Sequence, residues 1–131
     1  MLFSTLVKTL RKVVEEALET GEGGEEAWKT LIEDTTIDSE SEWREIYHSE
    51  IPSILRDSLR KLGLDCRLFH KKDDVPGFEY VANCVTREGR RIALGFDVDY
   101  DYEIGEVVLS FIKAYRDSEW APTQLTHYHE V

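Results

Sequence analysis

The chain has 131 residues, 27 of them acidic and 16 basic, so its formal net charge is −11 at pH 7. This length fits one domain with one core, and a hydrophobic fraction of 41% is typical of globular proteins rather than disordered ones. The acidity disfavours direct binding of nucleic acid or of an anionic membrane and favours partners with a basic surface. No stretch reaches the roughly 20 apolar residues of a membrane span, and basic residues interrupt the N-terminal apolar run too early for a signal peptide. We therefore expect a single cytoplasmic domain over residues 1–131.

The first half of the chain has the periodicity of helices. Apolar residues recur every three or four positions from Leu2 to Leu18, which predicts an amphipathic helix that ends at Gly21. A second helix is predicted from about residue 25 to residue 35, with Trp28 on its buried face. Two glutamates in its first turn support this prediction, because the helix dipole favours negative charge there.

A third helix is predicted after a capping-box pattern, in which Ser39 is followed by Glu42, and it starts near Trp43. Its apolar stripe stays in phase across Pro52. Proline is tolerated in the first turn of a helix but not in the interior, so the stripe fits either two consecutive helices or one kinked helix. Gly63 is the residue type that commonly ends a helix in the left-handed conformation.

After Gly63 the apolar period changes to two, which predicts strands. We place these strands near residues 64–70, 78–87, 90–100 and 106–116. Helices followed by strands with short turns predict an α+β fold, with three or four N-terminal helices packed on a C-terminal antiparallel sheet of about four strands. The domain then comprises a helical half (1–63), a sheet half (64–117) and a tail (118–131).

The two cysteines lie on different predicted strands. Cys66 and Cys84 lack CxxC spacing, so the sequence favours buried free thiols over a disulfide or a reactive thiol.

An acidic stripe lies within the third predicted strand. Asp97, Asp99 and Asp101 alternate with large apolar residues, and a period of two puts these three carboxylates on one face of the strand. This face is a candidate binding surface for a basic partner, since carboxylates pair with arginine and lysine side chains.

The register of the preceding strand decides which side chains join this stripe. If Glu88-Gly89 is a two-residue turn, Tyr80 pairs with Asp97 and Phe78 with Asp99 on the same face. A three-residue turn would invert the two faces. The predicted partner-binding surface combines carboxylates with aromatic side chains, and it consists of Asp97, Asp99, Asp101, Phe78, Tyr80, Tyr100, Tyr102 and Trp120.

Metal binding is an alternative use of the aspartates. Asp97 and Asp99, with Glu79 as a possible third ligand, offer oxygen atoms to a hard cation such as Mg²⁺. Residues two apart on a strand are about 6.6 Å apart, which permits a shared ion but does not favour it.

The histidines near the C-terminus are the other metal candidates. His127 and His129 have the spacing of a transition-metal ligand pair, and His48 or His70 could join them in the folded chain. A lone pair of this kind is weak evidence, so no metal or other cofactor is assigned.

The sequence supports a small acidic cytosolic binding protein, for example an inhibitor or immunity-type protein that occludes a basic partner such as a nuclease or a nucleic-acid-processing complex. No catalytic residue is assigned. One alternative is a metal-dependent enzyme that acts on phosphate or nucleotide substrates. Another is a structural subunit that assembles through exposed strands.

Overall fold

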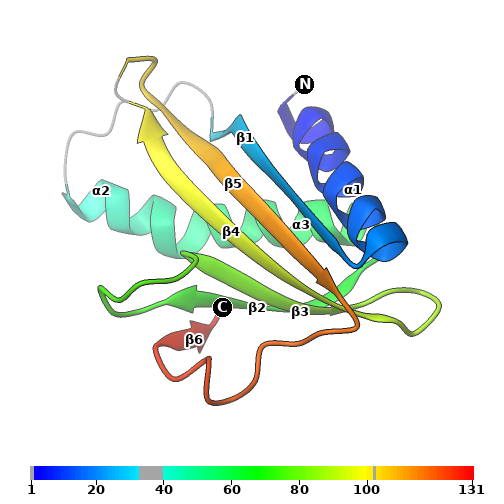
Figure 1. Cartoon of the computed structure of the whole chain (residues 1–131). Coiled ribbons are helices and arrows are strands. Elements are labelled where there is room, and N and C mark those ends of the chain that lie inside the picture. Colours follow the sequence, from blue (N-terminus) through cyan, green and yellow to red (C-terminus); the bar gives the residue numbers. More distant parts are fainter. Residues whose placement is uncertain (1, 33–39, 102) are drawn as a thin grey trace.

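The computed structural model describes residues 2–32, 40–101 and 103–131 (Figure 1). In chain order the elements are α1 (Leu2–Thr20), β1 (Glu22–Ile32), α2 (Glu40–Glu45), the π-helical turn η1 (Ile46–Glu50), α3 (Ile51–Lys61), β2 (Asp65–Lys71), β3 (Tyr80–Val85), β4 (Arg91–Asp101), β5 (Glu106–Arg116) and β6 (Tyr128–Glu130). None of the described helices is both long enough and apolar enough to cross a bilayer.

The strands form one antiparallel sheet in the order β1-β5-β4-β3-β2-β6, so β6 lies at the edge beside β2. In Figure 1 the continuous rod made of α2, η1 and α3 crosses behind the sheet, while α1 runs beside β1. Both helical segments share one core with the sheet. Leu10 of α1 and Leu55 of α3 are fully buried in the same cluster as Phe96 and Ile112 of the strands.

The expected number of helices and strands is wrong. The described residues contain two helical rods, because α2, η1 and α3 follow one another without a break, and the sheet has six strands instead of about four. The coarser expectation, an antiparallel sheet combined with helices, is confirmed. The four strands of the second half also lie within about two residues of their predicted positions, since strict alternation is a direct signal of a strand.

The largest error concerns β1, which occupies the position of the predicted second helix. After Gly23, the buried residues of β1 are Ala27 and Leu31. Their spacing of four residues is typical of one face of a helix. The cause is a pair of irregularities in the pairing with β5, since bulges insert extra residues and break the alternation. Trp28 lies at the first of them with a left-handed φ of 47° and is 58% exposed, so its predicted burial is also wrong.

The π-helical turn explains how one rod accommodates Pro52. The N–H of Ile51 donates to the carbonyl of Ile46, five residues earlier, and Pro52 then stands in the first turn of α3. A proline has no N–H to donate and clashes with the carbonyl four residues before it, so a locally widened turn relieves the conflict. The predicted capping residue Ser39 and the side chain of Trp43 lie outside the described residues.

The β3–β4 turn has three residues, so the register predicted from a two-residue turn is wrong. The N–H of Thr86 donates to the carbonyl of Arg90 at 2.8 Å, and Tyr80 pairs with Phe96. Tyr80 and Phe96 therefore share the face that packs on the helices, and Asp97 lies on the opposite face, which we term the open face.

The predicted free thiols are also wrong, because Cys66 and Cys84 form a disulfide. They are direct partners in the antiparallel register of β2 and β3, so their side chains leave the sheet on the same face. The bond closes a loop with a sequence separation of 18. A loop of this size stabilises a fold by about 3 kcal/mol.

Candidate metal centre

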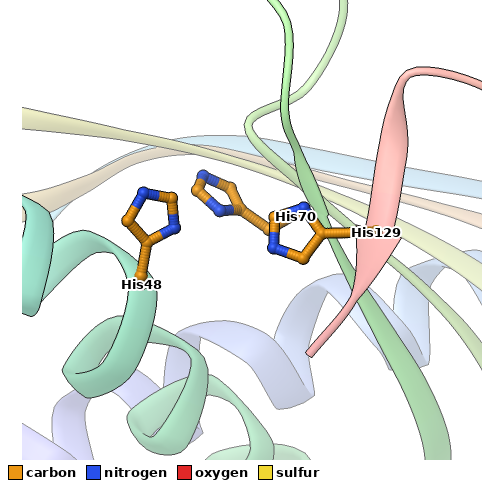
Figure 2. Close-up of side chains that lie close together, drawn as sticks. All are labelled: His48, His70 and His129. Carbon is orange, nitrogen blue, oxygen red and sulfur yellow. The ribbon is translucent and has the colours of Figure 1, made fainter.

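Three histidine side chains from separate elements converge beside β2 (Figure 2). His48 comes from η1, His70 from β2 and His129 from β6. One potential ligand nitrogen from each ring lies within 4.8 Å of the others. We term these residues the histidine cluster. Within the described ranges it is the one group of three or more histidine, cysteine, aspartate or glutamate side chains close enough to hold a metal ion.

The fold builds this cluster from two neighbouring strands and one irregular helical turn. His70 and His129 are register partners of β2 and β6, so their side chains lie next to each other on the same face, with ring centroids 5.5 Å apart. His48 approaches from the helical layer, with its ring centroid 4.9 Å from that of His70. Single π-helical turns often occur at functional sites, and this one carries His48.

His70 is the unusual member of the cluster. Its side chain is 1% exposed, and neither of its ring nitrogens has a hydrogen-bond partner among the described residues. The ring stacks on Tyr80, with centroids 4.5 Å apart, and it lies 4.6 Å from the ring of Tyr47. Leaving a buried polar group unpaired costs about 1–3 kcal/mol, so nearly all such groups in proteins have partners. The unpaired nitrogens of His70 therefore indicate that this side chain binds a ligand.

The electrostatic surroundings keep His70 neutral. Burial, reinforced by the neighbouring His48, His129 and Lys71, lowers the pKa of His70 to about 4. A metal ion binds the neutral imidazole and must otherwise displace a proton. At neutral pH the buried ligand of this cluster is consequently already in its binding form.

The spacing of the rings suits one transition-metal ion after small side-chain movements. Zinc binds histidine nitrogens at about 2.0–2.1 Å with tetrahedral angles, so two nitrogens on one ion lie about 3.3 Å apart. The present nitrogens lie within 4.8 Å of one another, and His48 and His129 are exposed, so their rings can rotate toward His70. Imidazole ligands favour zinc, copper, nickel and iron over magnesium and calcium.

A hydrogen-bonded network adjoins the cluster. The Tyr47 hydroxyl donates to the Glu79 carboxylate, and the Tyr80 hydroxyl donates to the Tyr47 carbonyl. The Nζ of Lys71 lies 3.6 Å from Glu79 Oε1. Burial is the main cause that raises the pKa of both tyrosines above its usual value, so both phenols stay protonated. The network therefore fixes the rings against which His70 packs.

The predicted histidine pair is divided by the structure. His129 joins both His48 and His70, whereas His127 lies in the turn before β6 and points its Nδ1 at Asp73 Oδ2, 2.8 Å away. Of the two histidines in the HxH pattern, only His129 thus belongs to the histidine cluster. The convergence of the other two depends on tertiary structure, which no local pattern reveals.

The acidic stripe, Asp97, Asp99 and Asp101, has backbone partners throughout. Asp97 is half-buried and accepts the N–H of Glu79 at 3.2 Å, while burial raises its carboxyl pKa. Asp99 is exposed and accepts the N–H of the next residue at 2.8 Å. Asp101 accepts the N–H of Glu103 at 3.0 Å. In the described part of the chain, neither these aspartates nor Glu79 belongs to a three-residue metal-ligand group.

The predicted aromatic residues do not share one surface. Tyr80 is fully buried on the helix-facing side, and Tyr100 packs against the core. Tyr102 lies outside the described residues. Phe78 covers Gly95 of β4 so closely that a Cβ on this glycine would lie 2.4 Å from the ring.

Trp120 belongs to the open face and is half-buried there. Its indole N–H donates to the Leu94 carbonyl at 2.9 Å, and its ring meets the edges of Phe78 and Tyr115, each with centroids 6.1 Å apart. The tail is held to the sheet by a further pair of bonds between Asn83 and the Trp120 backbone. Of the predicted aromatic residues, Phe78 and Trp120 are thus the two brought together.

The fold and the site together define an α+β domain with a three-histidine centre at one edge of its sheet. Comparison with protein-family models, curated proteins and solved structures yields no match to the chain. Functional inference therefore depends on the geometry of this centre.

Proposed function

We propose that this protein binds one divalent transition-metal ion, such as Zn²⁺, through His48, His70 and His129. The observation that carries the proposal is the buried His70, which lacks a hydrogen-bond partner among the described residues and faces two further imidazoles. A bound ion would satisfy one nitrogen of His70. The net charge of −11 supports the proposal as well, because an acidic protein attracts cations.

Calorimetric titration with ZnCl₂ tests this proposal. We expect one ion per chain for the unaltered protein. His70→Phe keeps a planar ring against Tyr80 but removes both nitrogens, so affinity should fall more than about 100-fold, which exceeds the usual effect of losing an outer-shell partner. His127→Ala is the matched control, because it removes the one histidine outside the cluster, and its affinity should equal that of the unaltered protein. Equal binding by all three proteins would refute the site.

A second candidate function, binding of a basic protein partner, is favoured by a pocket on the open face. Tyr115, Glu119 and Trp120 line this pocket, which has a volume of about 300 Å³. Aromatic faces beside a carboxylate suit the cationic end of an arginine or lysine side chain. Under this proposal the protein is an inhibitor or immunity-type protein that occludes its partner.

Fluorescence titration with an arginine-rich peptide tests the second candidate. We expect saturable binding that weakens when Trp120 is replaced by Ala and when salt is raised, and no binding of an acidic peptide of equal length. Trp28→Ala is the control, because Trp28 is an exposed tryptophan that does not line this pocket. Equal affinity for both peptides would exclude a basic partner at this pocket.

The Cys66–Cys84 disulfide argues against the cytoplasmic location expected from the sequence, because disulfides persist mainly in oxidising compartments. Thiol labelling in intact cells distinguishes a cytoplasmic location from an oxidising compartment. A cytoplasmic protein would be labelled at both cysteines without a reductant, whereas a protein from an oxidising compartment would be labelled only after reduction.

A further inference from the structure

We infer that the metal ion in this centre keeps one exchangeable coordination position, which accepts water or a small monodentate anion from solvent. The inference rests on the proposed metal site and concerns what that site can bind in addition. It follows from the number of available ligands, from their exposure and from the charge that they leave uncompensated.

The described residues supply three ligands and no fourth. No other histidine, cysteine, aspartate or glutamate from the described ranges belongs to the group around His48, His70 and His129. Both cysteines are bonded to each other and so cannot act as thiolate ligands. The Tyr47 hydroxyl adjoins the cluster but is hydrogen-bonded to Glu79. A tetrahedral zinc ion with three protein ligands takes its fourth ligand from solvent or substrate.

The fourth position opens to solvent because the three ligands differ in burial. His70 forms the floor of the centre with 1% exposure, whereas His48 and His129 are exposed. Figure 2 shows the rings of His48 and His129 reaching toward His70 from the helical turn and from β6. Because two of its three ligands are exposed, an ion held by all three rings would be reachable from solvent.

Charge decides which ligands this position prefers. Three neutral imidazoles leave the two positive charges of the ion uncompensated, and the adjoining carboxylate of Glu79 is already engaged by Tyr47 and Lys71. A small anion would compensate part of that charge. Water at the same position would lose a proton at a pH near neutrality, as it does on other three-histidine zinc ions. A centre of this kind meets the minimum requirement for metal-assisted hydrolysis.

Cobalt substitution tests the exchangeable position, since the visible spectrum of Co²⁺ reports its coordination. The protein is loaded with one equivalent of CoCl₂ and titrated with sodium azide. We expect the visible bands to shift with saturation behaviour at one site, and His127→Ala to give the same shift. We also expect the azide-free spectrum to change with a single protonation step near neutral pH, owing to the bound water.

The outcomes separate the two proposals. A cobalt spectrum that forms but stays constant with azide and with pH would overturn the exchangeable position and leave the metal site intact. A protein that develops no cobalt spectrum would refute the metal site and the exchangeable position together. An azide response that persists in His70→Phe would place the responding ion elsewhere and would overturn the inference.

Discussion

The histidine cluster and the acidic stripe lie on opposite faces of one sheet and differ in how their polar atoms are satisfied. Each aspartate of the stripe accepts at least one backbone N–H of its own chain. His70 has no such partner within the described residues, although it is almost completely buried. A set of like residues in a sequence therefore does not by itself make a binding site. A buried polar group that the fold leaves without a hydrogen-bond partner is the better indication of a ligand-binding site.

The two groups also differ in how they are assembled. The aspartates follow one another along β4, where alternate residues are about 6.6 Å apart, so they spread along the strand. The histidines come from three elements and meet within 4.8 Å.

Acid should destabilise the metal-free protein through His70. Its pKa in the folded protein is about 4, below the usual value near 6.5, so the unfolded chain binds a proton in this interval that the folded chain does not. The contribution of His70 to stability is complete above about pH 6.5 and is lost as the pH falls toward 4, on the order of 3 kcal/mol in total. Urea denaturation between these pH values measures it. His70→Phe should lack this component, and an identical pH profile in both proteins would contradict the assignment.

Zinc should stabilise the fold by linkage. A ligand that binds only the folded state adds about 2.7 kcal/mol at a concentration 100 times its dissociation constant. We expect the midpoint of thermal unfolding to rise on addition of ZnCl₂, to return after chelation, and to rise equally in His127→Ala. Absence of any shift in the unaltered protein, at zinc concentrations that saturate the calorimetric signal, would mean that the ion binds folded and unfolded chains alike.

Replacing His70 by Phe should make the metal-free protein more stable at neutral pH. The substitution removes two unpaired nitrogens, retains the stacking on Tyr80, and should add about 1–2 kcal/mol to the free energy of unfolding. Denaturant unfolding of the two metal-free proteins checks this value. A marked loss of stability would show instead that His70 is satisfied within the fold.

The corresponding change in the acidic stripe should have the smallest effect. Replacing Asp97, Asp99 and Asp101 together by Asn preserves an oxygen acceptor for each backbone N–H and removes repulsion of a few tenths of a kcal/mol. The melting temperature should stay constant or rise slightly, while binding of the arginine-rich peptide should weaken. A loss of several kcal/mol would show that the charges themselves hold the fold together.

These contrasts explain what the sequence could predict. The four later strands follow from alternation, and it was correct to put Asp97 on the face opposite Phe96. The bulges of β1 were hidden, because an inserted residue turns a period of two into a spacing of four. The length of the turn after Thr86 determines which face each residue of β3 occupies. Because this turn has one residue more than expected, the predicted faces of β3 were reversed.

The candidate site was less accessible to sequence analysis than the strands. His129 was identified from its HxH pattern, but its meeting with His48 and His70 depends on the pairing of β6 with β2 and on the π-helical turn. The Cys66–Cys84 bond depends likewise on the register of β2 and β3. Long-range pairing of this kind leaves no local periodicity to read.

Anomalous X-ray diffraction from crystals grown with zinc locates a bound ion without any assumption about its ligands. Data collected on both sides of the zinc absorption edge should give one strong difference peak per chain, in contact with nitrogens of His48, His70 and His129. No peak is expected beside His127, which is paired with Asp73. A fully occupied peak elsewhere, or none at the histidine cluster under saturating zinc, would refute metal binding by His48, His70 and His129.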